Sequence, residues 1–159
     1  MYANAQDDTE VQGLSDLLSI WTHDGLSPLT VVKGFSDLLH EGYIGPLNQQ
    51  QKTTIHTIRL SAQTVIDSWN ELVDYFHKAT LKPSLSANKL TTDEFHTLRN
   101  GIIDPAITTL KTIQAQTARL LNQTDGELTT QQFESLEAVH RACFSAIQRW
   151  HDPLDYFAN

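Results

Sequence analysis

The chain has 159 residues, of which 40% are hydrophobic, and it carries a formal net charge of −8 with a pI near 5.2. This length suits one domain with a real core. An acidic chain without a Lys/Arg cluster argues against nucleic acid and anionic membranes as partners. The polar segment Met1 to Glu10 is not a signal peptide, and no apolar run approaches the roughly 20 residues of a membrane span.

The single cysteine, Cys143, excludes an internal disulfide and fits a reducing compartment. His140 lies three residues before it, but Cys143 occupies an apolar position of its predicted helix, so we expect a buried thiol and not a metal ligand. These features predict a cytoplasmic protein that binds no cofactor and no metal.

The first predicted helix starts near Asp7, which with Glu10 would form a capping box, and it ends in the glycine- and proline-containing stretch 41–46. Its apolar positions alternate between spacings of four and three, as on the buried face of a bundle helix. They are Leu14, Leu18, Trp21, Gly25, Pro28, Val32, Phe35 and Leu39.

The second predicted helix starts at Asn48, which pairs with Gln51 as a capping box, and a polar stretch, 78–90, follows it as a linker. The spacing of its apolar residues is the same as in the first helix. These residues are Ile55, Ile58, Ala62, Val65, Trp69, Leu72 and Phe76.

The third predicted helix runs from Thr91, capped with Glu94, to about Leu120. A turn over 122–127 separates it from a fourth helix that starts at Thr129, paired with Gln132, and continues to about Phe157. Pro153 is expected to kink this last helix or to end its regular part early.

The fourth helix repeats the second at a constant offset of 81 residues. Trp69 aligns with Trp150, and Asp74-Tyr75-Phe76 with Asp155-Tyr156-Phe157. The first and third helices align more loosely, through Ser27-Pro28 and Asp104-Pro105. We interpret this pattern as an internal duplication.

The duplication predicts an all-α protein in which two tandem helical hairpins, 8–77 and 91–158, form one antiparallel four-helix bundle. The single domain, 1–159, would then be a pseudo-dimer within one chain. We expect Trp69 and Trp150 to be buried at similar heights, and the protein to be a monomer or a weak homodimer.

One segment of the first helix has the residues for phosphoryl chemistry. His23 lies between the apolar positions Trp21 and Gly25, so it should point outward, whereas Trp21, Val32 and Phe35 should be buried. A phosphate-accepting histidine needs one exposed ring nitrogen and profits from a carboxylate that holds the proton of the other, a role open to Asp24. Ser27 follows one turn later on the same face.

This segment resembles the phosphoacceptor box of the histidine-kinase dimerisation and histidine-phosphotransfer (DHp) domain, which reads His, acid, two variable residues, Thr or Asn, then Pro-Leu. The resemblance covers roughly residues 14 to 76 and includes Gly45-Pro46-Leu47 and the stretch 70–75. It implies that His23 is the phosphorylated residue, Asp24 its acid-base partner, and Ser27 the residue that helps to orient a hydrolytic water.

Two departures from that pattern bear on function. Gly25 and Leu26 replace what is usually a leucine followed by a basic residue. The second repeat has Asn100, Gly101 and Asp104 where the first has His23, Asp24 and Ser27. No glycine-rich nucleotide loop is present, so we expect no ATP-dependent kinase activity from this chain alone.

The resemblance implies a response regulator or a histidine kinase as the partner. We expect docking through the residues around His23, such as Leu26, and through Ile66, Trp69 and Asn70 on the second helix, which antiparallel pairing places at the same height.

Four interpretations remain open, and we prefer the first. The lost second site and Leu26 favour a non-enzymatic interaction or regulatory module of a two-component system. The intact His23-Asp24 and Ser27-Pro28 favour a histidine phosphotransfer protein. The chain could also be a structural bundle whose kinase-like ancestry is no longer used, or a fragment of a longer kinase, which the duplication argues against.

Overall fold

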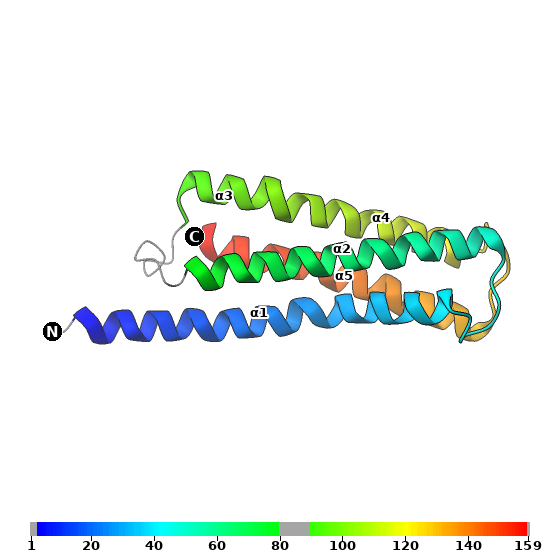
Figure 1. Cartoon of the computed structure of the whole chain (residues 1–159), viewed down its shortest axis with the longest axis horizontal. Helices are drawn as coiled ribbons and strands as arrows, with labels where there is room; N and C mark the ends of the chain where they lie inside the picture. Colours follow the sequence, from blue (N-terminus) through cyan, green and yellow to red (C-terminus); the bar gives the residue numbers. More distant parts are fainter. Residues whose placement is uncertain (1–2, 80–89, 159) are drawn as a thin grey trace.

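The computed structural model describes residues 3–79 and 90–158, and within these ranges the protein is helical and has no strand. Four long helical runs lie side by side as a bundle, with the tight turns together at one end and both chain termini toward the other (Figure 1). The all-α class is therefore as expected. The elements are α1 (Ala3–His40), α2 (Gln49–Ala79), α3 (Thr92–Leu98), η2 (Arg99–Ile103), α4 (Asp104–Leu121) and α5 (Thr130–Ala158).

Each long helix packs against two others. α1 contacts α2 and α5, and α4 contacts the same two helices. Most of the predicted linker, residues 80–89, lies outside the described residues.

Three of the predicted helix starts are confirmed by their hydrogen bonds. Asn48 and Gln51 form a reciprocal capping box, with distances of 3.0 and 2.8 Å between backbone nitrogen and side-chain oxygen. Thr129 and Gln132 do the same at α5, and the Thr91 hydroxyl accepts the backbone N–H of Glu94 at 3.1 Å. These side chains satisfy N–H groups that a helix start leaves without partners.

The start of α1 differs from the prediction. The helix begins at Ala3, so Asp7 and Glu10 lie inside it and the predicted capping box is wrong. Residues 3–6 include two alanines and no glycine or proline, and therefore nothing in them ends the helix.

Neither proline inside a helix ends it. Pro28 lies within α1 and Pro153 within α5, which continues to Ala158, so the predicted early end at Pro153 is wrong. Pro153 is buried, and tertiary packing of this kind can hold a helix together where one backbone hydrogen bond is missing.

The third helix contains a segment that the sequence analysis did not predict. Between α3 and α4 the backbone adopts the π form over Arg99–Ile103, and the N–H of Asp104 donates to the carbonyl of Arg99. Such a segment accommodates one extra residue per turn. It contains Asn100 and Gly101, the residues that align with His23 and Asp24.

The buried face of α1 agrees with the prediction at Trp21, Val32 and Leu39 but not at two positions between them. Phe35 and Pro28 are only half-buried, and the following residues, Leu29 and Ser36, are buried instead. The expected burial of Phe35 is therefore wrong. Adjacent positions such as 28 and 29, or 35 and 36, flank the middle of the inward face, so apolar spacing alone does not decide which of the two is buried.

Trp69 and Trp150 meet in the middle of the core. Each is 1% exposed, and their rings pack edge to face with centroids 4.9 Å apart. The expected burial of both tryptophans is confirmed. Such aromatic pairs contribute about 0.5–1.5 kcal/mol beyond their buried area.

The two turns at the far end of the bundle are joined by a pair of buried glutamines. The amide of Gln51 donates to the carbonyl of Glu127 at 3.2 Å, and that of Gln132 donates to the carbonyl of Pro46 at 3.0 Å. The residues of one bond differ from those of the other by the 81-residue offset of the repeat.

Candidate functional site

His23 and Asp24 form an exposed pair on the outer face of α1. The side chain of His23 is 84% exposed and that of Asp24 is 43% exposed, and 3.3 Å separates Nδ1 from Oδ1. The predicted exposure of His23 is confirmed. In the tautomer that carries its proton on Nδ1, the Asp24 carboxylate accepts that proton, and the ring lone pair is on Nε2.

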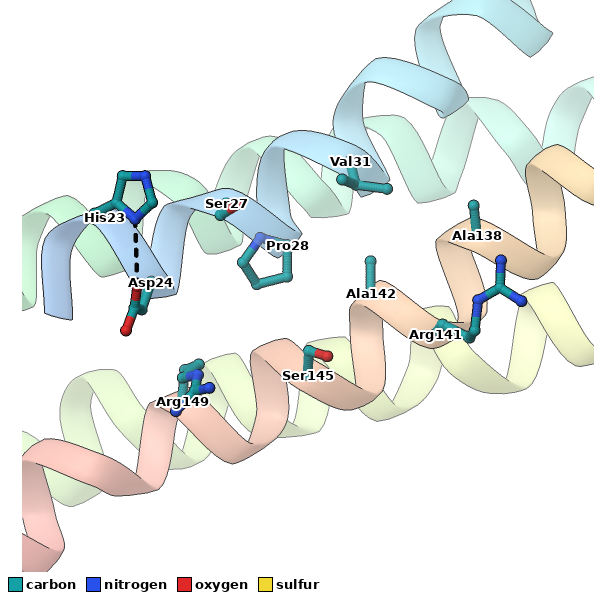
Figure 2. Close-up of a pocket in the computed structure, with 10 residues that line it drawn as sticks. All are labelled: His23, Asp24, Ser27, Pro28, Val31, Ala138, Arg141, Ala142, Ser145 and Arg149. Carbon is teal, nitrogen blue, oxygen red and sulfur yellow. Dashed lines mark hydrogen bonds and ion pairs between the residues drawn. The ribbon is translucent and has the colours of Figure 1, made fainter. Parts of the chain in front are cut away.

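A groove of about 440 Å³ separates this part of α1 from α5 (Figure 2). On the α1 side it is lined by His23, Asp24, Ser27, Pro28 and Val31. On the α5 side it is lined by Ala138, Arg141, Ala142, Ser145 and Arg149. All three predicted site residues, His23, Asp24 and Ser27, therefore border one groove.

The two arginines of α5 were not among the predicted site residues. Arg141 and Arg149 are exposed and lie two turns apart on one face of the helix, with Ser145 between them (Figure 2). Arg149 pairs with Asp152 of the same helix at 3.2 Å. A comparison of the two repeats could have indicated these residues, because the arginines stand where the first repeat has the uncharged residues Leu60 and Ser68.

A second hollow, of about 770 Å³, borders His23 on its other side. It is formed mainly by α1 residues, including Thr22, Leu26 and Ser27, with His77 contributed by α2. His23 thus stands on the ridge between two hollows, accessible to a macromolecular partner from either side.

The predicted docking residues on α2 are not brought to His23 as a group. Trp69 is buried against Trp150 and cannot touch a partner, so its assignment to the docking surface is wrong. Ile66 is half-buried, and Asn70 is exposed but borders a separate hollow with Asp67, Glu71 and Asp74. Leu26 is half-buried beside His23, as a docking residue requires.

Other reactive side chains do not form a site of this kind. Among the described residues, no group of three or more His, Cys, Asp or Glu side chains could hold a metal ion. Burial raises the pKa of the Cys143 thiol to about 12, so this cysteine is a core residue and not a nucleophile. None of the helices in the described ranges is long and apolar enough to cross a membrane.

Comparison with known proteins identifies no relative. No protein-family model matches the chain, and no curated protein and no solved structure is significantly similar to it. The function of the protein is therefore inferred from the residues that line the groove and from their geometry.

Proposed function

We propose that this protein is a two-component-type histidine phosphotransfer protein, in which His23 accepts a phosphoryl group from the phosphoaspartate of a response regulator or returns it. The observation that carries the proposal is the exposed His23 ring, with Nδ1 bonded to Asp24 and Nε2 open to solvent. A phosphate-accepting histidine needs an exposed ring nitrogen and profits from a carboxylate at the other nitrogen, and His23 has both features.

The reaction requires no further reagent. Nε2 of neutral His23 attacks phosphorus, the P–O bond to the regulator's carboxylate breaks, and the electron pair leaves with that carboxylate. The product is a phosphoimidazolium whose positive charge, shared with Nδ1–H, is stabilised by Asp24 at 3.3 Å. Asp24 therefore acts as the acid-base partner of His23, and Ser27, one turn away, would orient the water of the hydrolytic step.

We further propose that the bundle is a pseudo-dimer of two tandem DHp-like hairpins, with one active site instead of two. In a two-fold symmetric dimer, each contact occurs twice: if residue i of one subunit contacts residue j of the other, then residue j of the first also contacts residue i of the second. The reciprocal bonds of Gln51 and Gln132, and the self-pairing of Trp69 with its equivalent Trp150, are contacts of this kind. They support descent from a homodimer by duplication.

The second candidate function is the non-catalytic interaction module that the sequence favours. Two observations support it: the second repeat has Asn100 in place of a nucleophile, and Leu26 stands where a basic residue is usual. Exposed apolar side chains on α1, Val31 and Leu38, are available for binding a kinase or regulator. In this case His23 would contribute contact area and no chemistry.

The test is phosphorylation of the purified chain by phosphorylated response regulators from the same cell. We expect an acid-labile, base-stable phosphate on the chain, abolished by His23→Ala. The matched control is His151→Ala, which removes another exposed histidine, on α5, and should leave the label intact. Both variants should stay folded because exposed side chains contribute little to packing.

Binding measurements separate the two candidates. Asp24→Asn should slow transfer and leave regulator binding mostly intact. If regulators or kinases bind but no phosphate appears, and His23→Ala binds as well as the unchanged chain, the interaction module is correct. If no two-component partner binds or labels the chain, both signalling functions fail.

A further inference from the structure

The groove beside His23 combines a nucleophile from one repeat with cations from the other. His23, Asp24 and Ser27 come from α1, and Arg141 and Arg149 come from α5 (Figure 2). Neither hairpin alone contains both sets. The packing of α1 against α5 is what brings them together.

The two repeats differ at these positions in a correlated way. Under the offset of 81, Arg141 and Arg149 align with Leu60 and Ser68 on α2. α2 packs against η2 and α4, which include the segment that has lost the histidine. The arginines are thus present across the groove from the helix that carries His23, and absent across from the segment in which Asn100 replaces it.

The positive charges also stand out against the rest of the chain. The protein has a formal charge of −8 and only 11 Lys and Arg residues, yet two arginines line this one groove. Ala138, Ala142 and Ser145 form the floor between and beside them, and these small side chains leave the space open. A groove of this composition suits a small anion.

We propose that Arg149, which lies level with His23 across the groove, binds the oxygens of the phosphoryl group that His23 receives, and that Arg141, two turns away along α5, guides the anion along the groove, so that the groove is an oxyanion site for an acyl phosphate or phosphoramidate (Figure 2). This inference rests on the proposed function. A guanidinium binds phosphate oxygens through two parallel N–H donors, as it binds a carboxylate. Arg149 already holds the carboxylate of Asp152, and it exchanges that partner for the phosphoryl group when the donor arrives.

The arginines are positioning residues, because Nε2 of His23 does the chemistry. They neutralise the dianion as it approaches an acidic protein and hold phosphorus in line with Nε2. Removal of one charge-assisted contact should therefore slow transfer by at least about tenfold, without changing the nucleophile.

The decisive experiment uses a donor too small to need a docking surface. The purified full chain is incubated with phosphoramidate, and the rate of His23 phosphorylation is compared for Arg141→Gln, Arg149→Gln, Arg149→Lys and Arg99→Gln. Arg99 is the matched control, an exposed arginine that pairs with Asp104 on the other side of the bundle. We expect slow labelling of the two α5 Gln variants, partial recovery in Arg149→Lys, and no change in Arg99→Gln.

A binding readout tests the anion site separately from catalysis. Inorganic phosphate is titrated into the isotope-labelled, unphosphorylated chain. It should shift the side-chain Nε–H NMR signals of Arg141 and Arg149, whereas chloride at equal ionic strength should not. The Arg99 signal should stay in place in both titrations.

The outcomes distinguish the two proposals. If His23 is labelled equally fast in all variants and phosphate moves neither signal, the oxyanion site is wrong and the phosphotransfer function stands. Slower transfer from a regulator with unchanged phosphoramidate labelling also overturns the site, because the arginines would then contact the partner protein. If no donor labels His23, phosphotransfer fails, and the phosphate titration alone decides whether the groove binds an anion.

Discussion

The backbone of Gly25 on α1 lies directly against the indole ring of Trp69 on α2. A Cβ built on Gly25 would overlap with Cε2 and Cζ2 of that ring. Trp69 in turn packs edge to face on Trp150. Gly25 therefore makes room on α1 for the Trp69 ring, two residues along the helix from His23.

Gly25→Ala should destabilise the protein, although the same change inside a helix ordinarily stabilises it by about 1 kcal/mol. The added methyl group must displace the Trp69 ring, and overpacking of this kind costs about 1–3 kcal/mol. Urea unfolding followed by tryptophan fluorescence measures the difference in the free energy of unfolding.

Gly34→Ala is the matched control, in the same helix. No atom lies within 4 Å of a Cβ built on Gly34, so this variant should gain up to about 1 kcal/mol of stability. Equal stabilisation by both substitutions would contradict the packing of Gly25 against Trp69.

Gln132→Ala should destabilise the protein by about 1–3 kcal/mol, because the residue is 1% exposed and its amide serves two purposes. Its oxygen caps α5 through the N–H of Thr129, and its nitrogen bonds the carbonyl of Pro46 in the other turn. Gln49→Ala, at an exposed glutamine in the first turn of α2, should change stability by less than about 0.5 kcal/mol. Equal unfolding temperatures of the two variants would contradict both roles of Gln132.

Cys143 should resist thiol reagents in the folded protein. Its side chain is 0% exposed and burial raises its pKa to about 12, so the reactive thiolate is both scarce and inaccessible. The rate of reaction with a disulfide reagent should rise steeply with urea, following the unfolding transition. Immediate reaction of the single thiol in native buffer would contradict this prediction, because it would mean that the helices around Cys143 separate in the folded protein.

His40 should make the protein less stable in mild acid. Its pKa is lowered from 6.5, first by burial, then by the nearby charges of Arg59, His56 and Lys52, while Glu41 opposes the shift. The Arg59 guanidinium donates to Nδ1 of the neutral ring at 3.3 Å. The unfolded chain therefore binds a proton at this residue more readily than the folded one, and the free energy of unfolding should fall as pH drops below about 6.5.

NMR titration of the imidazole signals measures this effect. Arg59→Gln should bring the pKa of His40 back toward 6.5, and His40→Gln should reduce the loss of stability in acid. An unchanged acid dependence in His40→Gln would show that other groups cause it.

The sequence by itself determined the all-α class, three of the four helix starts and the exposure of His23. These features depend on neighbours along the chain: a capping pair such as Asn48 and Gln51 is three residues apart, and the phase of His23 follows from Trp21 two residues earlier. Local spacing is enough for such predictions. Alignment of the repeats added Trp150 as a core residue, because Trp69 already belonged to the apolar face.

Only the tertiary structure decided which helix faces the histidine. Each helix of a bundle has two neighbours, and antiparallel pairing places residues at similar heights on both, so periodicity alone cannot choose between α2 and α5. The packing of α1 against α5 gives the groove its two arginines. The burial of Leu29 and Ser36 in place of Pro28 and Phe35 could not be predicted from the sequence for a related reason, because it depends on the packing of residues on other helices. The same holds for the π segment at Arg99–Ile103.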